Sequence, residues 1–364
     1  GAFRCLKASA LVIASTLMIS PVAFGGPLID IIRAMPEGGW VRANTNKFSD
    51  VWPSSKDGPT PPYSPWKIID SHSGFAWDSK RGDLILYGGG HASTAGNDVY
   101  RWRGSTQRWE RSSLPSKVVG IGVGPLYNPI DGPDNAPASA HTYKNNVYLE
   151  VADRLLTFGG AAFNTGGNFL KQRADGSLTP TGPYLWDPAK ADGSKVGGTN
   201  GSGFDPSVLG GQMWQNRDTW FNGLGPQPTI YVSGAAAYAK ENGKDVVYLS
   251  AGQGGGSQKH LFRYTINNLA TPTTDVWERI GINFYSAFSD QGVVAYDPVR
   301  KIYVRTGNGT RPFGYWDLNQ PGESLDAPFT PAVLSGTYDF ANSRNCGMEF
   351  DPVRSLFFIW CGGA

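Results

Sequence analysis

The chain has 364 residues, among them 48 glycines, 26 prolines, 12 tryptophans, 16 tyrosines and 18 phenylalanines. So many glycines and prolines argue against long helices and favour short strands joined by tight turns. Only 17% of the residues are charged, and the formal net charge is +2. This balance gives no indication of a nucleic-acid partner or of binding to a membrane surface.

Residues 1–25 have the pattern of a secretory signal peptide. Arg4 and Lys7 precede the apolar stretch 8–19, and small residues follow around Ala23, with cleavage expected near Gly25 or Gly26. A transmembrane anchor is the alternative, but the apolar stretch is short for a bilayer. Loss of Arg4 and Lys7 would bring the net charge to zero. We therefore expect a secreted or periplasmic protein with no membrane contact after cleavage.

The cysteines agree with export. Cys5 would leave with the signal, and Cys346 and Cys361 would lie on two adjacent antiparallel strands. We predict a disulfide between these two residues, the alternative being two buried free thiols. There is no Cys/His cluster at metal-ligand spacing, so no structural zinc and no other cofactor is expected.

Residues 26–70 form an N-terminal segment. Its Trp40-Val41-Arg42 is similar to Trp109-Glu110-Arg111 and Trp277-Glu278-Arg279 further along the chain. In a closed toroid of sheets, an N-terminal strand of this kind can complete the last sheet and remove its open edge. The sequence therefore predicts a closing strand near Trp40.

From residue 71 onward, a pattern of short strands and glycine turns recurs. A strand ending in Asp78 is followed by a turn, a second strand, the glycines 88–90 and further strands with a Trp. The same order returns in GVVAYDPVRKIYVRTG, which ends at Gly307, and in GMEFDPVRSLFFIWCG, which ends at Gly362. A period of about 55 residues built from short strands is typical of a β-propeller.

Residues 71–364 can be divided into propeller blades of four antiparallel strands, named a to d from the channel outward. Blade one takes residues 74–77, 83–87, 98–102 and 109–111 as its strands. Blade two begins near His141, has a Gly-rich insertion over residues 163–211, and is closed by MWQNRDTWFN. Blade three spans about residues 231–282, with VVYLSAG, HLFRYTI and VWERIG as strands b, c and d.

Blade four spans about residues 289–334, and blade five begins near Asn342. The sequence ends just after strand b of blade five, so we expect a C-terminally incomplete propeller that has six or seven blades when whole. The DPVR copies at residues 297–300 and 351–354 are predicted to be structural turns between strands a and b.

The glycine doublet after strand b, the aromatic residue of strand c and the Trp of strand d resemble kelch-type repeats, as in the propeller domain of galactose oxidase. The resemblance covers about residues 40–364 and implies a fold. Kelch-like propellers include enzymes, sugar binders and protein-interaction scaffolds, so the fold does not choose among these functions.

All four histidines are predicted to face one rim, because strand a starts and strand b ends on the same side of a blade. His72 and His141 stand at the starts of strand a in two adjacent blades, strand a of blade two being AHTYKNNVYLEV, and His91 follows the glycines of blade one. His260 opens strand c of blade three, further from the axis. Imidazoles exchange protons near neutral pH, so His72, His91 and His141, with nearby Tyr143, form a candidate acid/base site. The alternative is that these histidines are structural loop residues.

The set is similar to that of propeller polysaccharide lyases acting on ulvan, which use His, Tyr and Arg on one propeller face. The resemblance implies β-elimination on a uronic-acid polymer. His91 and His141 would be base and charge stabiliser, in either order, with Tyr143 as acid and His72 in support. No arginine aligns specifically; Arg311 and Arg344 are the candidates for binding the substrate.

Three functions of different classes remain. The first is an exported carbohydrate-active lyase. The second is a non-catalytic propeller that binds a carbohydrate or a protein through aromatic and polar loop residues. The third is a copper radical oxidase of the galactose oxidase kind, which needs a Tyr–Cys cross-link that two disulfide-bonded cysteines could not supply. The sequence does not indicate the oligomeric state.

Overall fold

The computed structural model describes residues 27–54, 63–121, 126–163, 165–200, 205, 207–219, 228–229, 234–253, 259–284, 292–306, 313–320, 326–329 and 346–361. The predicted signal of residues 1–25 lies outside these residues. Among the helices of the described ranges, none is both long and apolar enough to cross a membrane. The helices are α1 (Pro27–Ala34) and α2 (Trp66–Asp70), with 3-10 turns η1 (Phe48–Val51), η3 (Pro188–Lys190) and η4 (Pro272–Thr274).

Blade one is confirmed as a four-stranded antiparallel sheet. Its strands are β1 (Phe75–Asp78), β2 (Asp83–Leu86), β3 (Tyr100–Arg103) and β4 (Arg108–Arg111), hydrogen-bonded in chain order. Each strand falls within two residues of its predicted bounds. Helix α2 covers this sheet, because Ile68 is fully buried in a cluster with Leu86 and Tyr100. The helix therefore leads the chain directly to His72.

Blade two differs from the prediction in two places. Its strands are β8 (Asn146–Leu149), β9 (Arg154–Thr157), β13 (Tyr184–Trp186) and β14 (Trp214–Asn216). Strand β13, which is strand c of this blade, lies inside the stretch 163–211 that we expected to be an insertion. It was not predicted because it follows a long excursion and its short apolar run gives a weak signal. His141 is not on strand a but on a separate short strand that precedes it. Closure of the blade by MWQNRDTWFN is confirmed by β14.

Blades three and four follow the predicted order. Blade three has β16 (Ala235–Glu241), β17 (Lys244–Gln253), β18 (Lys259–Ile266) and β19 (Val276–Phe284), and β15 (Pro228–Thr229) also pairs with β17. Blade four has β20 (Val294–Asp297), β21 (Ile302–Thr306), β22 (Phe313–Asp317) and β23 (Asp326–Phe329). The hairpin of β24 (Cys346–Asp351) and β25 (Leu356–Cys361) provides strands a and b of blade five.

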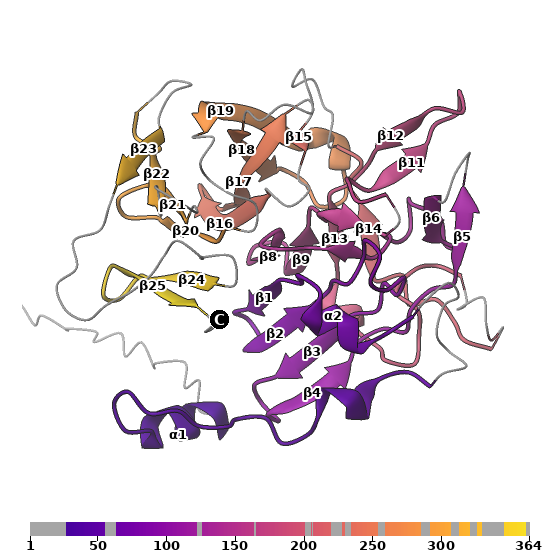
Figure 1. Cartoon of the computed structure of the whole chain (residues 1–364), viewed down its shortest axis with the longest axis horizontal. Coiled ribbons are helices and arrows are strands. Elements are labelled where there is room, and N and C mark those ends of the chain that lie inside the picture. Colours follow the sequence, from indigo (N-terminus) through magenta and orange to yellow (C-terminus); the bar gives the residue numbers. More distant parts are fainter. Residues whose placement is uncertain are drawn as a thin grey trace, which may run out of the picture.

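The sheets are arranged radially, as in a β-propeller. Contacts join the innermost strands in the order β1, β8, β16, β20 and β24, and Figure 1 shows these strands around the centre of the molecule. A central cavity of about 410 Å³ is lined by residues from all five of them. The strands and glycine turns of the sequence thus form an all-β propeller.

Within the described residues, three two-stranded ribbons form separate sheets outside the blades. They are β5 (Val118–Ile121) with β6 (Leu126–Pro129), β7 (Ala140–His141) with β10 (Ala161–Ala162), and β11 (Leu170–Gln172) with β12 (Leu178–Pro180). The sequence analysis did not predict them. The β7–β10 ribbon matters most for function, because it holds His141 directly opposite Ala161.

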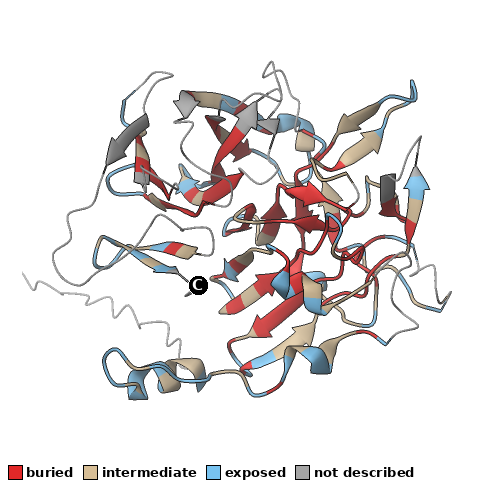
Figure 2. Ribbon diagram, in the orientation of Figure 1, coloured by how far each residue is buried: buried red, intermediate tan, exposed pale blue. Residues whose placement is uncertain are grey.

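The core fills the space between neighbouring blades. Figure 2 shows buried residues concentrated on the inner strands and on the blades around β8, β9 and β13. In three blades an aromatic residue of strand c lies opposite the Trp of strand d: Trp102 and Trp109, Trp186 and Trp214, and Tyr264 and Trp277. These cross-strand aromatic pairs stabilise each blade in addition to their burial of apolar area.

The predicted structural turns between strands a and b have one geometry. In the DPVR copies, Arg300 bonds Asp297 at 2.6 Å and Arg354 bonds Asp351 at 3.0 Å. Blade one repeats this arrangement, with Arg81 bonded to Asp78 at 2.9 Å. In each turn the carboxylate also accepts backbone N–H groups, which fixes the chain reversal.

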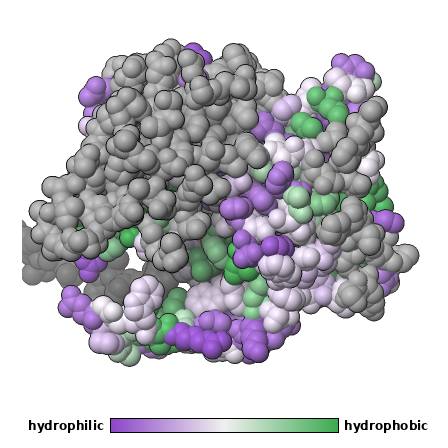
Figure 3. All heavy atoms as spheres, viewed as in Figure 1, coloured by the Kyte–Doolittle hydropathy of each residue, from purple (hydrophilic) through white to green (hydrophobic). Residues whose placement is uncertain are grey.

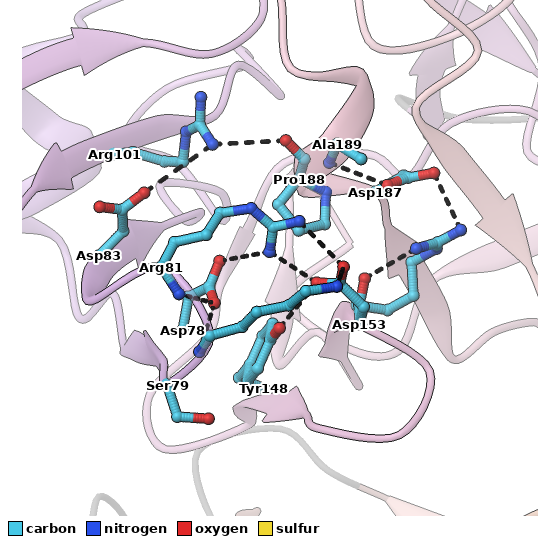
Figure 4. Close-up of polar contacts among 12 residues, drawn as sticks. Asp78, Ser79, Arg81, Asp83, Arg101, Tyr148, Asp153, Asp187, Pro188 and Ala189 are labelled. Atoms are coloured by element: carbon cyan, nitrogen blue, oxygen red, sulfur yellow. Dashed lines mark hydrogen bonds and ion pairs between the residues drawn. The ribbon is translucent and has the colours of Figure 1, made fainter. Parts of the chain in front are cut away.

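In blade one the turn also connects two blades. Arg81 binds Asp153, in the corresponding turn of blade two, and Tyr148 donates to the same carboxylate at 2.7 Å (Figure 4). Arg81 and the other hydrogen-bond donors hold the pKa of Asp153 well below its ordinary value. The network links the turn of blade one to that of blade two, the two blades at which His72, His91 and His141 lie.

The strand expected near Trp40 is not formed. Residues 40–42 have no strand assignment, and Trp40 is 96% exposed. The chain is instead attached to blade one a few residues later, where Asn46 exchanges two hydrogen bonds with the backbone of Trp109. This segment covers the outer edge of β4, which would otherwise be open.

The predicted disulfide is favoured by strand register. Cys346 and Cys361 are paired directly across β24 and β25. We expect titration of the unfolded, unreduced mature protein to detect no free thiol, whereas two titratable thiols would contradict the disulfide. Reduction should lower the free energy of unfolding by about 3 kcal/mol, because a loop of this length loses its constraint in the unfolded chain.

Candidate functional site

The four residues predicted to form an acid/base site do lie together. His72 precedes β1, His91 follows the glycines after β2, and His141 and Tyr143 lie at the start of blade two. The His141 ring centroid lies 5.1 Å from that of His72, 5.4 Å from that of His91 and 5.9 Å from that of Tyr143. His72 also lies 5.4 Å from Tyr143. We call these four residues the histidine cluster.

The backbone of the cluster adopts an uncommon conformation. His72, His91 and Tyr143 have φ angles of 50°, 47° and 45°, and they are three of the ten non-glycine residues with positive φ in the described ranges. This left-handed region is unfavourable for residues with a side chain and occurs more often at functional sites. Three residues of one cluster share this unfavourable conformation. Such a concentration of backbone strain makes the cluster a candidate functional site.

Two glycines allow the elements of the cluster to approach one another. A Cβ atom on Gly90 would lie 2.1 Å from the Cα of Ala140, and one on Gly160 would lie 1.8 Å from the carbonyl oxygen of His141. Gly90 also has a φ of 58°. The glycine run that predicted the end of strand b thus also allows β7 to pass close to blade one.

His141 is the buried centre of the cluster. It is 6% exposed, its Nε2 lies 3.2 Å from Oγ of Ser93, and its Nδ1 lies 3.4 Å from the hydroxyl of Tyr143. Burial, and then the neighbouring His72 and His91, lower the pKa of His141 from 6.5 to about 4. His141 is therefore neutral at neutral pH.

This shift makes the stability of the fold depend on pH. Because the folded pKa lies below the unfolded one, the unfolded chain binds the extra proton between these values. The contribution of neutral His141 to the free energy of unfolding is complete above about pH 6.5. It is lost as the pH falls to about 4, and the loss is about 3 kcal/mol. Denaturant unfolding of the wild type and of His141→Gln should show this loss only in the wild type. Equal pH dependence in both would contradict it.

The other members of the cluster are accessible. His72 and His91 are exposed and Tyr143 is partly buried. His72 and Tyr143 line a cleft of about 1060 Å³ to which blades one, two, four and five contribute residues. Two indoles on the same cleft, those of Trp77 and Trp360, are 49% and 55% exposed. Exposed aromatic faces beside polar groups are suited to stacking on sugar rings.

Sequence reasoning missed a cation in this cleft. Lys144 follows Tyr143 directly, lines the same cleft, and lies 3.0 Å from the exposed carboxylate of Glu349 on β24. Its position beside Tyr143 in the sequence was the available signal. The predicted substrate-binding residues Arg311 and Arg344 both lie outside the described residues. His260 is buried within β18, where its ring contacts Phe262.

Among the described residues, no group of three His, Cys, Asp or Glu side chains is arranged to hold a metal ion. On the described part of the face in Figure 3, hydrophilic and hydrophobic residues are interspersed.

No protein-family model matches the chain, and no curated protein matches it. Among solved structures, it is similar to an alpha-L-arabinanase of Penicillium chrysogenum complexed with arabinobiose, with 14% identity and a TM-score of 0.42. The match covers 84% of this chain and 78% of the arabinanase. At this level the similarity concerns the backbone alone.

Proposed function

We propose that the protein is an exported polysaccharide lyase that cleaves a uronic-acid polymer by β-elimination at the histidine cluster. One observation carries this proposal: three imidazoles and a phenol from two blades lie in ring contact at one rim. Such a set supplies a proton acceptor and a proton donor within the span of one sugar residue. The kelch-type character of the repeats belongs to the same proposal.

In this reaction His91 is the base. It removes the proton from the sugar carbon next to the carboxylate, and the electron pair of that C–H bond forms a double bond to the neighbouring carbon. The bond from that carbon to the glycosidic oxygen breaks, and the oxygen takes a proton from Tyr143. The products are a chain with an unsaturated uronate at its end and a chain with a free hydroxyl group.

Exposure and charge support this distribution of roles. His91 is exposed and can meet a polymer, whereas His141 is buried and neutral. A neutral His141 provides no full positive charge for the substrate carboxylate, so it is better suited to act on Tyr143, whose hydroxyl it contacts. His72 also lies beside the phenol ring of Tyr143, with 5.4 Å between the two ring centroids.

Lys144 would bind the substrate carboxylate. When the base removes the proton, negative charge develops beside that carboxylate. A nearby ammonium group stabilises this charge. Its present partner Glu349 is exposed, and exposed ion pairs contribute only about 0–1 kcal/mol, so a carboxylate of the substrate can replace it.

We expect Lys144→Met to raise KM on a polyuronide by about tenfold or more, because it removes a charge-assisted contact. Lys144→Arg is the matched control and should keep most of the affinity. Glu349→Gln should lower KM, because it frees the ammonium group. Initial rates over a range of polymer concentrations measure all three, and an unchanged KM in Lys144→Met would remove this residue from the site.

The function is tested by ultraviolet absorbance, which rises when unsaturated uronates form. The purified protein should produce this rise on an acidic polysaccharide and none on a neutral one. If the protein retards the glycan in an affinity gel without shortening it, it is a binding propeller. Release of peroxide by copper-loaded protein would indicate the oxidase.

A further inference from the structure

We infer that Ser93 is a positioning residue that holds His141 in the tautomer with its proton on Nδ1, facing the oxygen of Tyr143. This inference rests on the proposed function, because it explains how Tyr143 can act as the acid. The sequence analysis did not single out Ser93, which lies in the turn that follows the glycine run.

The geometry places one imidazole between two hydroxyl groups. Ser93 Oγ lies 3.2 Å from Nε2 of His141, and the Tyr143 hydroxyl lies 3.4 Å from Nδ1. The position of Ser93 is fixed by its turn, because its N–H donates to the carbonyl of Gly90 at 2.9 Å and Thr94 bridges to Gly90. His141 is fixed by the pairing of β7 with β10.

A neutral imidazole has one donor and one acceptor nitrogen, so the two contacts depend on each other. If Tyr143 donates to Nδ1, its proton points at His141 and away from the substrate. If Ser93 donates to Nε2, the proton of the ring lies on Nδ1 and is donated to the Tyr143 oxygen. The Tyr143 hydroxyl then does not donate to His141, so its proton can pass to the leaving oxygen, and the phenolate that forms is stabilised by the Nδ1–H group.

The tautomer can be measured without any catalytic assay. The chain has four histidines, so nitrogen-15 NMR of the imidazoles can assign each ring by single His→Gln substitutions. We expect His141 to carry its proton on Nδ1 in the wild type and in Ser93→Thr, and to lose this preference in Ser93→Ala. A proton on Nε2 in the wild type, or no change in Ser93→Ala, would overturn the inference.

A second experiment tests whether Ser93 acts through Tyr143. On the polysaccharide, Ser93→Ala should lower kcat about tenfold, and Ser93→Thr should restore it. On a uronide with a nitrophenolate leaving group at the same carbon, which needs no acid, both Ser93→Ala and Tyr143→Phe should lower kcat by about twofold at most. Equal loss on both substrates would show a merely structural role.

The two experiments separate this inference from the proposed function. If the wild type cleaves no acidic polysaccharide, the proposed function fails, and the NMR result still decides whether Ser93 sets the tautomer. If the wild type cleaves the polymer and His141 carries its proton on Nε2, the function stands and the role of Ser93 fails.

Discussion

Replacing His91 with glutamine is expected to lower kcat for β-elimination by about 10²- to 10⁴-fold, the range that a positioned acid or base contributes. Glutamine is similar in size and still forms hydrogen bonds, but it cannot accept the proton from the sugar carbon. The effect should appear in kcat with KM changed little, since we assign binding of the polymer to Lys144 and the exposed indoles that line the cleft. Ultraviolet initial rates on the same polyuronide measure both constants.

The matched control for this variant is His72→Gln. His72 is also exposed and belongs to the same cluster, but the proposed reaction transfers no proton to or from it. We expect its loss to lower kcat by about tenfold at most. Equal losses in the two variants would show that the cluster acts as a structural unit, and a larger loss in His72→Gln would exchange the two roles.

Replacing Asp275 with alanine should destabilise the fold by about 3–5 kcal/mol, because it leaves a buried guanidinium without its counter-charge. Arg217 and Asp275 are both fully buried and share two hydrogen bonds of 2.8 Å. Tyr264 also donates to Asp275, and Arg217 donates to the carbonyl of Asn268. These contacts join blade two, just after β14, to the turn before β19 of blade three.

Two control variants make this prediction specific. The double variant Arg217→Met with Asp275→Leu removes both charges, so it should be much less destabilised than Asp275→Ala. Asp351→Asn removes a turn pair whose Arg354 is 70% exposed, and it should destabilise the fold far less than Asp275→Ala. Denaturant unfolding measures all three, and an equal cost for Asp275→Ala and Asp351→Asn would refute the account.

The sequence was most informative where local pattern and fold coincide. The glycine turns and strand lengths predicted blade one closely. Because strand a starts and strand b ends on the same side of a blade, the sequence also predicted that His72, His91 and His141 would meet. Both inferences use the antiparallel order within a blade. They needed no knowledge of contacts between distant segments.

What the sequence did not show depends on such contacts. Strand β13 follows an excursion of more than twenty residues after β9, so its pairing could not be inferred from spacing. The burial of His141 comes from the β7–β10 ribbon, and its contact with Ser93 joins residues 48 positions apart. The closing strand near Trp40 was inferred from similarity of three residues alone, and these residues form no strand.

The most direct test of the central claim, β-elimination at the histidine cluster, is digestion of a polyuronide in water labelled with heavy oxygen, followed by mass spectrometry of the products. Elimination adds no water, so we predict that each cleavage gives one unsaturated end and no labelled oxygen. His91→Gln should give almost no product. Saturated products that carry the label would show hydrolysis and would contradict the proposed reaction.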